Sequence, residues 1–470
     1  MNDDDAQARD GARASGVADA GRGGQNPTGP GDGAEPGTAT TGRTKAEVAT
    51  QLMEQVVERG NMWAAYERVL RNKGAPGADG MPVGELKAWL QAHWLSVKAA
   101  LLAGSYLPRE VRAVDIPKPS GGVRTLGVPT VVDRLIQQAL LQVLQPIFEP
   151  RFSESSYGFR PARNAWQAVQ AARDHVRSGK GWVADIDLAK FFDRVNHDVL
   201  MARVAREVKD GRVLGIIRRF LEAGLMRDGL IERRQQGTPQ GGPLSPLLSN
   251  IMLTDLDREL ERRGHAFVRY ADDCNVYLGS RKAAEHAFEA IGKYLESELK
   301  LQVNRDKSAV ARASTRDFLG YGLIGRETAR LKVAAASVVR LRQKVKALLR
   351  EKHGAGLAAI TEALNPLLRG WTSYFRHAQV KDVWQELDGW IRRKLRCRLW
   401  RYGKRPYARA KSLMQQGLTR ERAWRSATNG RGAWWNSGAS HMNAAFPKSF
   451  FDRVGLVSLV DTHRRFQLQP

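Results

Sequence analysis

Two adjacent carboxylates, Asp272 and Asp273, interrupt an apolar stretch that runs from residue 266 to residue 278. This pattern predicts a β-hairpin with the acid pair at its tip. Two acids at a turn repel each other and are costly to desolvate, so a divalent cation would offset that cost. Mg²⁺ is the natural candidate, because it prefers carboxylate oxygens and leaves coordination positions for substrate phosphates. An ordinary exposed Asp-Asp turn is the competing interpretation.

A second apolar stretch, residues 181–187, also leads to carboxylates and ends at Asp187. If the two acid-bearing strands lie side by side in one sheet, three acids converge there: Asp187, Asp272 and Asp273. Such a trio would hold two Mg²⁺ ions roughly 4 Å apart. That arrangement suits nucleotidyl transfer, in which positioning and charge stabilisation carry the chemistry. Asp185 and Asp193 are further acids nearby that could be structural.

Residues 111–119 alternate like a strand, residues 120–122 form a turn, and residues 123–128 return as a second strand. The resulting hairpin carries Lys118 and Arg124 near its tip. Two cations on a hairpin can clamp a triphosphate. Solvated charges on the hairpin are the alternative interpretation.

The 470-residue chain is too long for one core, and its net charge of +26 implies a polyanionic partner, nucleic acid before membrane. Residues 330–470 hold 29 basic and 8 acidic side chains, a net of +21, so most of the excess lies in the last third. No apolar run is long enough to span a membrane, and the N-terminus lacks a secretory h-region. The two cysteines exclude a disulfide framework and a multi-thiolate zinc site, which fits a reducing cytoplasm.

Residues 1–44 contain almost no large apolar side chains and are expected to be disordered. Between 110 and 325 strands and helices follow in mixed order, which favours an α+β fold with an antiparallel sheet backed by helices. Periodicity predicts these helices in the first 330 residues: 83–102, 131–148, 165–177, 199–208, 214–225, 247–260 and 283–299.

Beyond residue 335 the pattern is helical, with apolar stripes in 338–348 and 383–395 and basic residues on the other faces. Seven of the twelve tryptophans lie between 371 and 435. Basic helices interleaved with aromatics suit a surface that tracks a nucleic-acid backbone and stacks bases. A plain amphipathic helical bundle is the alternative. The candidate RNA-binding residues are Arg392, Arg393, Lys394, Arg396 and Arg398.

Several stretches together resemble one family. Residues 270–273, Tyr-Ala-Asp-Asp, resemble the Tyr-X-Asp-Asp motif of reverse transcriptases, and residues 186–193 resemble the first acidic motif of the polymerase palm. Residues 238–250 are similar to the motif between them in bacterial group II intron enzymes. Residues 369–375 and the basic helix to residue 398 resemble the group II intron maturase domain. Further matching motifs are residues 72–80, 116–119, 157–161 and 318–320, so the resemblance covers about residues 45–470.

This resemblance implies a right-hand polymerase. Fingers and palm would occupy 45–330 with an N-terminal extension at 45–80, an all-α thumb/maturase domain 331–415, and a maturase or DNA-binding-like tail 416–470. It assigns metal binding to Asp187, Asp272 and Asp273, and the steric gate that favours dNTPs to Phe192. Four residues would contact the incoming nucleotide or its pyrophosphate: Lys118, Arg124, Gln240 and Lys307.

The implied activity is RNA-directed DNA synthesis that copies intron RNA with two Mg²⁺ ions, together with assistance to splicing and retrohoming. The implied partners are group II intron RNA, target DNA, a DNA primer and dNTPs, in the cytoplasm and on the nucleoid. Cys397 is the last cysteine, and residues 399–470 contain only His441 and His463, so no His-Asn-His endonuclease is expected. A splicing-only cofactor and a domesticated defence or diversity-generating reverse transcriptase stay open.

A final segment, residues 432–443, also resembles the end segment of relatives that lack the endonuclease. It contains the adjacent tryptophans Trp434 and Trp435. The sequence provides no mechanism for it, and docking on intron RNA or on the maturase core are both open.

Overall fold

The computed structural model describes residues 51–117, 123–227, 230–232, 236–238, 241–325 and 328–468. The chain divides into two compact units. The first contains residues up to 168 with 192–255 and 269–271, and the second contains 169–191, 256–268 and the chain from 272 onward. The tail expected to be disordered, residues 1–44, lies outside the described residues.

The core of the first unit is α5 (Val131–Phe148), a largely buried helix with the bounds that periodicity predicted. Thr130 caps it by accepting a hydrogen bond from the backbone N–H of Asp133 at 3.1 Å. Helix α3 (Arg59–Asn72) packs along α5, as does the short α2 (Leu52–Val56). The other helices wholly in this unit are α4 (Leu86–Leu102), α8 (His197–Glu207) and α9 (Gly211–Glu222).

The predicted hairpin of the first unit is confirmed as β1 (Val111–Pro117) and β2 (Val123–Val128), which pair antiparallel. Two short strands extend this sheet to the order β2-β1-β4-β5: β4 (Leu225–Arg227) runs parallel to β1, and β5 (Leu230–Glu232) pairs antiparallel with β4. The prediction that a helix continues to residue 225 is therefore wrong at its end. Leu225 pairs with Val111, and a Cβ on Gly224 would lie 2.7 Å from Ile231 Cγ2.

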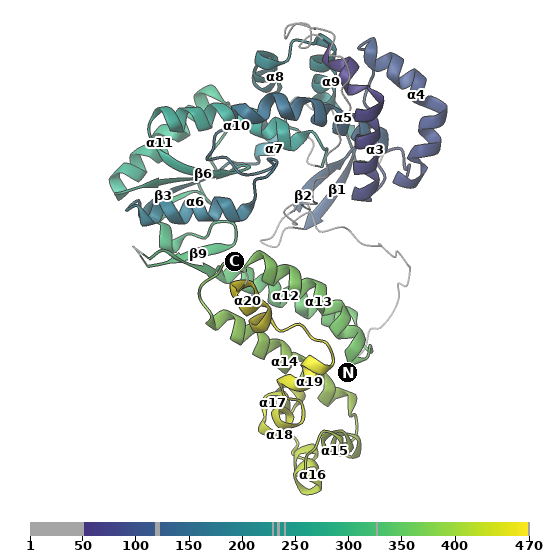
Figure 1. Ribbon diagram of the computed structural model, residues 1–470, viewed down its shortest axis with the longest axis vertical. Coiled ribbons are helices and arrows are strands. Elements are labelled where there is room, and N and C mark those ends of the chain that lie inside the picture. The colour runs from purple at the N-terminus through teal and green to yellow at the C-terminus, as the bar shows by residue number, and fades with distance from the viewer. Residues whose placement is uncertain are drawn as a thin grey trace, which may run out of the picture. The chain divides into compact units, whose positions relative to one another are not determined.

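The second unit contains an antiparallel sheet of order β6-β7-β3-β8, so the α+β prediction is confirmed. Its strands are β6 (Ala266–Tyr270), β7 (Asp273–Leu278), β3 (Trp182–Asp187) and β8 (Ala309–Arg312). Helix α11 (Arg281–Glu298) packs on β3, β7 and β8 (Figure 1). The remaining helices of this part of the chain are α6 (Ala165–Arg177), α7 (Phe191–Arg194) and α10 (Ser245–Arg262).

A hairpin of β9 (Tyr321–Ile324) and β10 (Arg330–Val333) leads into the helices of the second unit. Helices α12 (Ala335–Glu351) and α13 (Leu357–Tyr374) lie side by side, and α20 (Leu459–Leu468) packs on both α13 and α14 (Asp382–Tyr402) (Figure 1). Tyr374 connects this bundle to the segment just before the hairpin, because its hydroxyl donates to the Leu319 carbonyl at 2.9 Å. The helical character predicted beyond residue 335 is confirmed.

Five short helices complete the C-terminal region. Helices α15 (Pro406–Gln415) and α16 (Arg420–Ala427) pack on each other, and α17 (Ala433–Gly438) packs on α14. The last two are α18 (Ser440–Ala445) and α19 (Lys448–Arg453). Among the residues that the structure describes, no helix has the length and apolarity needed to cross a bilayer. The domain boundaries near 330 and 415 stay predictions.

Candidate active site

The two acid-bearing strands lie side by side. Asp187, the last residue of β3, is the direct cross-strand partner of Asp273, the first residue of β7, and Asp272 occupies the turn before it. Directly opposite residues of an antiparallel pair have Cβ atoms about 4.5–5.5 Å apart. The predicted adjacency of the acid-bearing strands is therefore confirmed.

Carboxylates outnumber cations at this edge of the sheet. Burial, followed by the neighbouring Asp185, Asp272 and Asp187, raises the pKa of Asp273 to about 8, while Arg316 opposes the shift. A hard divalent cation fits such a donor set. Within the described residues no three Asp, Glu, His or Cys side chains are grouped closely enough to hold a metal by themselves. Waters and substrate phosphates would have to supply the other ligands of a cation bound here.

Asp187 is oriented by the loop that precedes β8. Its backbone N–H donates to Ser308 Oγ at 2.9 Å, and Asn304 Nδ2 donates to its Oδ1 at 3.1 Å. Lys307 from the same loop places its Nζ 3.9 Å from Asp187 Oδ2, with 65% of its side chain exposed. The loop therefore fixes a metal-ligand candidate and keeps a solvent-accessible ammonium beside it.

Arg316 ties this loop to the sheet. Its Nε donates to Asp185 Oδ2 at 2.7 Å, and its Nη2 donates to the Lys307 carbonyl at 2.8 Å. Burial raises the pKa of Asp185 even though Arg316 opposes that shift. Asp185, to which the sequence assigned no role, thus anchors the arginine that holds the Lys307 loop. The sequence signal for Arg316 was only its position two residues before the Phe-Leu-Gly motif.

The Tyr-Ala-Asp-Asp turn rests on a buried polar network. Ala271 has a left-handed φ of +58°, and a Cβ on Gly158 would lie 2.3 Å from its backbone nitrogen. Arg269, fully buried, donates through Nη1 to the Ala271 carbonyl at 2.8 Å and to Asn250 Oδ1 at 3.1 Å. Asn250 Nδ2 donates to the Gly158 carbonyl at 2.8 Å. Three sequence motifs therefore meet under one turn.

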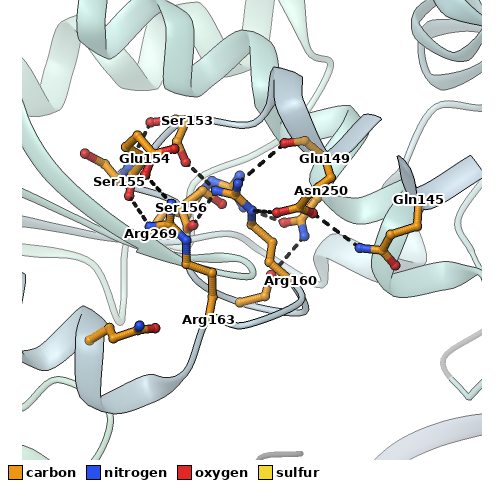
Figure 2. A network of polar contacts seen from close by, with 12 residues as sticks. Gln145, Glu149, Ser153, Glu154, Ser155, Ser156, Arg160, Arg163, Asn250 and Arg269 are labelled. Atoms are coloured by element: carbon orange, nitrogen blue, oxygen red, sulfur yellow. Dashed lines mark hydrogen bonds and ion pairs between the residues drawn. The ribbon is translucent and has the colours of Figure 1, made fainter. Parts of the chain in front are cut away.

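A second arginine, Arg160, organises the loop that runs beside β6 (Figure 2). Its Nε donates to Glu149 Oε1 at 2.7 Å, and its Nη1 donates to the carbonyls of Ser153 and Ser156 at 2.5 and 2.8 Å. The same loop is bonded to Arg269, whose N–H donates to the Ser155 carbonyl at 2.9 Å. Arg160 belongs to the matching motif at residues 157–161, but neither it nor its hydrogen-bond partners had a predicted role. The signal that could have identified Arg160 was its place in that motif, whereas its partners Glu149, Ser153 and Ser156 lie outside it.

A groove of about 930 Å³ opens next to this loop in the first unit. Most of its lining side chains are cationic, amide or aromatic, and Tyr270 of the acid-pair motif is one of them. Phe159 also lines the groove; its side chain is 47% exposed, and its backbone has a left-handed φ of +59°. Phosphates attract the guanidinium groups, and bases stack on aromatic rings, so the lining suits a nucleic-acid strand. The arginines that line it are Arg68, Arg71, Arg160 and Arg163.

The structure describes the expected nucleotide-contacting residues only in part. Lys118, Gln240 and the side chain of Arg124 lie outside what it describes. Gly241, which follows Gln240, lies against the hairpin that carries Arg124, because a Cβ on Gly241 would be 2.6 Å from the Gly127 carbonyl oxygen. The loop and the hairpin are thus neighbours in the first unit.

Phe192 is half-buried, whereas Phe191 is 2% exposed and belongs to the core. The Phe192 carbonyl accepts a hydrogen bond from the N–H of Thr238 at 2.6 Å. A Cβ on Gly237 would lie 2.9 Å from that same carbonyl oxygen, so the glycine allows the loop to approach closely. The backbone of the predicted gate residue is therefore fixed by the glycine-rich loop.

The basic residues of α14 have different environments. Arg396 is buried, donates to the Phe446 carbonyl at 2.9 Å, and has its pKa lowered by burial to about 10. Arg398 donates to the Leu349 carbonyl at 3.0 Å, and Arg392 lies 3.5 Å from Asp388. The contacts of Arg396 and Arg398 join α14 to neighbouring segments, whereas that of Arg392 lies within α14. Arg393 and Lys394 instead lie over the ring of Trp434. Of the five residues predicted to bind RNA, Arg396 and Arg398 thus contact carbonyls of the protein itself, and the RNA-binding assignment stays a prediction.

Two protein-family models match the chain. The model described as reverse transcriptase (RNA-dependent DNA polymerase) matches residues 116–323, and the model described as group II intron, maturase-specific domain, matches residues 338–417. The first match includes all three acids of the sheet edge, and the second includes α14.

Among curated proteins, protein YkfC of Escherichia coli is 33% identical over 328 residues, which cover 61% of this chain and 86% of YkfC. The group II intron-encoded protein LtrA of Lactococcus lactis is 27% identical over 359 residues, covering 61% of this chain and 58% of LtrA. This chain therefore spans a little over half the length of LtrA. A solved telomerase structure from Candida tropicalis is 15% identical with a TM-score of 0.39 and covers 60% of this chain and 57% of the telomerase chain.

The matched domains follow each other in the order that the motifs predicted, and the acids of the first domain share one sheet edge. The chain belongs to the family of group II intron-encoded proteins, with a reverse transcriptase domain followed by a maturase domain.

Proposed function

We propose that this protein is an RNA-directed DNA polymerase that copies group II intron RNA and also assists splicing and mobility of that intron. The observation that carries the polymerase proposal is the register in which Asp187 lies opposite Asp273, with Asp272 in the adjoining turn. The reverse transcriptase match over the same residues supports it.

Two Mg²⁺ ions at these acids would activate a primer 3′-hydroxyl and neutralise the departing pyrophosphate. Asn304 and Ser308 keep the Asp187 carboxylate in one orientation, because both bond to it or to its backbone. Lys307 donates a proton toward the pyrophosphate. It is the exposed cation nearest Asp187 among the described residues.

The incoming nucleotide is selected and held by residues of the first unit. Lys118 and Arg124 clamp the triphosphate, Gln240 lies beneath the nucleotide, and Phe192 excludes a 2′-hydroxyl by its volume. The close approach of Gly241 to the Gly127 carbonyl supports this grouping, since it brings the Gln240 loop beside the strand of Arg124.

The RNA template enters along the groove lined by Arg68, Arg71, Arg160 and Arg163. The guanidinium groups of Arg68, Arg71 and Arg163 would contact phosphates, while the buried Arg160 holds the loop, and the exposed ring of Phe159 offers a stacking face. The amide side chains Gln138, Gln142 and Gln145 line the same groove and can accept or donate hydrogen bonds to base edges or to the 2′-hydroxyl.

The maturase function belongs to the helices that follow the sheet. The maturase-specific match over 338–417 supports intron RNA binding by these helices. Target DNA and a DNA primer would join the intron RNA when the protein acts on the nucleoid, and the protein otherwise works in the cytoplasm. The second candidate, a splicing-only cofactor, predicts maturase activity without DNA synthesis.

Primer extension by the purified protein on an RNA template, with Mg²⁺ and dNTPs, separates the two candidates. We expect DNA product from the wild-type chain and none from Asp272→Ala, whose RNA binding should be retained. An absence of product from pure wild-type protein contradicts the polymerase. A splicing assay on the group II intron at low Mg²⁺ tests the maturase role in the same two proteins, and a splicing loss in Asp272→Ala would contradict the division of labour.

A further inference from the structure

Two neighbouring tryptophans of α17 are exposed. Trp434 is 41% and Trp435 is 52% exposed, whereas Trp384 and Trp400 of α14 are buried at 1% and 3%. Large aromatic side chains are usually kept out of water unless their ring faces have a partner to meet. The exposed pair is therefore a candidate contact surface.

Cations lie over both rings. Arg393 Cζ is 4.1 Å and Lys394 Nζ is 4.4 Å from the centroid of the Trp434 ring, and Arg431 Cζ is 5.5 Å from that of Trp435. These distances are within the range of cation–π attraction. Rings and cations together form the tryptophan surface: Trp434, Trp435, Arg393, Lys394 and Arg431.

The charges of the tryptophan surface have no acidic counterpart in the part of the chain that the structure describes. None of the ion pairs of those residues includes Arg393, Lys394 or Arg431, whereas Arg392 next to them lies near Asp388. Burial lowers the pKa of Lys394, and the cations Lys346, Arg401 and Arg393 lower it further. Like charges held together without an acid favour a polyanionic ligand.

Hydrogen bonds hold the backbone around the tryptophan surface. Asn436 is fully buried and donates to the carbonyls of Arg431 and Gly432 at 2.8 and 3.2 Å. Ser437 Oγ donates to the Trp434 carbonyl at 2.7 Å. A Cβ on Gly438 would lie 3.0 Å from the Arg393 guanidinium, so glycine lets α17 approach α14 closely. A surface ordered before binding loses less entropy when a ligand stacks on it.

We propose that the tryptophan surface binds an unpaired segment of the intron RNA, with bases stacked on Trp434 and Trp435 and phosphates held by Arg393, Lys394 and Arg431. This inference rests on the proposed function, because it takes intron RNA to be the partner. Exposed indole rings with adjacent cations offer stacking faces and phosphate contacts to a single strand, whereas the bases of a duplex are already stacked on each other. An acidic protein segment would satisfy the charges but would leave the rings without a stacking partner.

Photocrosslinking tests this surface at residue level. The full chain is irradiated with an unstructured oligoribonucleotide that contains 5-iodouridine, and crosslinked residues are mapped by mass spectrometry. We expect crosslinks at Trp434 or Trp435 that are competed by unlabelled single-stranded RNA and not by duplex RNA. Efficient competition by duplex RNA or by polyglutamate, or crosslinks that avoid both tryptophans, would overturn the proposal. Stronger competition by oligodeoxythymidylate than by oligouridylate would overturn the choice of RNA.

Affinity measurements with the same oligoribonucleotide add a quantitative arm. The Trp434→Leu/Trp435→Leu variant keeps apolar side chains of smaller volume and removes the stacking faces, so its affinity should fall about tenfold or more. Trp63→Leu is the matched control, because Trp63 is 61% exposed and lies elsewhere, on α3. A fall that is equal in both variants would contradict the proposal.

Salt dependence separates phosphate contact from packing. Lys394→Gln should lower the slope of log affinity against log salt by about one, as the loss of one phosphate contact does. Arg425→Gln is its control, since Arg425 is exposed and paired with Glu421. Equal unfolding temperatures of the variants and the wild type ensure that a lost affinity is not a folding defect. If the Trp434→Leu/Trp435→Leu variant fails to fold, the salt slope of Lys394→Gln and the wild-type crosslinks still test RNA binding by the tryptophan surface.

Primer extension by the wild-type chain runs in parallel. Its failure would overturn the proposed polymerase, whereas the crosslinks would still test this surface. Crosslinks that are absent from a chain that does extend primers would overturn this inference alone.

Discussion

The acid-bearing sheet edge and the tryptophan surface lie in the same unit and carry excess charge of opposite sign. At the sheet edge, Asp185, Asp187, Asp272 and Asp273 face two cations, Arg316 and Lys307. At the tryptophan surface, cations crowd each other over aromatic rings. Each region leaves an excess charge that a ligand of the other sign would neutralise.

The two regions differ in how they are held. The acids are fixed by backbone pairing and by hydrogen bonds from Asn304 and Ser308, which set the direction of a carboxylate. The tryptophan surface is held by contacts between cations and rings and by one buried amide, Asn436. These contacts position the rings but do not orient any one hydrogen-bonding group. Catalysis needs positioned donors within a fraction of an ångström, whereas stacking on RNA tolerates many sequences.

Removing a carboxylate from the sheet edge should have the largest effect. Asp187→Asn keeps the volume and the hydrogen bonds but loses the negative charge, so DNA synthesis should fall by about 10³-fold or more, a loss of several kcal/mol of charge stabilisation. RNA crosslinking at Trp434 should be unchanged. Single-turnover primer extension measures DNA synthesis, and mass-spectrometric mapping measures crosslinking at Trp434. A loss of RNA crosslinking that parallels the loss of DNA synthesis would contradict the assignment of separate functions to the two regions.

Disturbing the support of the acid turn should have the next largest effect. Gly158→Ala adds a Cβ that would lie 2.3 Å from the Ala271 nitrogen, so the turn must shift and synthesis should fall on the order of 10²-fold. Gly84→Ala is the control, because nothing lies within 4 Å of a Cβ there. Steady-state primer extension together with thermal unfolding checks both variants. Wild-type activity in Gly158→Ala would show that the turn tolerates displacement.

Loosening the Lys307 loop should have a moderate effect. Arg316→Gln removes the bonds to Asp185 and to the Lys307 carbonyl, and we expect kcat to fall roughly tenfold. The KM for dNTP should change little, and Arg316→Lys should restore part of the rate. Arg305→Gln is the control, since Arg305 lies on the same loop and forms an exposed pair with Glu289 of α11. A rise in KM without a change in kcat would assign Arg316 to nucleotide binding instead.

The smallest effect on DNA synthesis is expected at Asp133, a buried acid outside the acid-bearing sheet edge. The Asp133→Asn variant tests whether burial with a raised pKa is enough to make an acid catalytic. Asp133 is 1% exposed and accepts hydrogen bonds from Tyr106, Thr130 and the N–H of Arg109, and burial raises its pKa to about 6. A raised folded-state pKa gives stability that is present below the unfolded-state value near 4 and is lost as pH rises through about 6.

The wild-type chain should therefore lose up to about 3 kcal/mol of unfolding free energy between pH 4 and pH 7, relative to Asp133→Asn. Denaturant unfolding at several pH values measures this difference. DNA synthesis by the variant should stay near the wild-type rate, because this acid lies away from the sheet edge in sequence and serves packing. Identical pH profiles of the two proteins would contradict the assignment.

Local patterns predicted the parts of the site that depend on local structure. The hairpin at Asp272 and Asp273 and the helix α5 follow from alternation and periodicity, which neighbours in sequence determine. The strands β8, β9 and β10 were missed because each has four residues, too few for a period to be recognised.

The support of the site could not be predicted, because its members are far apart in the chain. Asn250 and Gly158 are 92 residues apart, and Arg316 and Asp185 are 131 apart. Sequence reasoning named Arg396 and Arg398 for RNA on charge alone, yet their donors reach backbone carbonyls of neighbouring segments. A charge pattern gives the number of cations on a helix but not the direction of each side chain.

The exposed indoles of α17 also have a photophysical consequence. Emission from Trp434 and Trp435 should lie to the red of that from the buried Trp384 and Trp400, because water relaxes around an exposed excited ring. The cations over these rings attract iodide and repel caesium, so the anionic quencher should extinguish this red component more strongly than the cationic one. The protein thus carries its own optical probe of whatever polyanion displaces iodide from that surface.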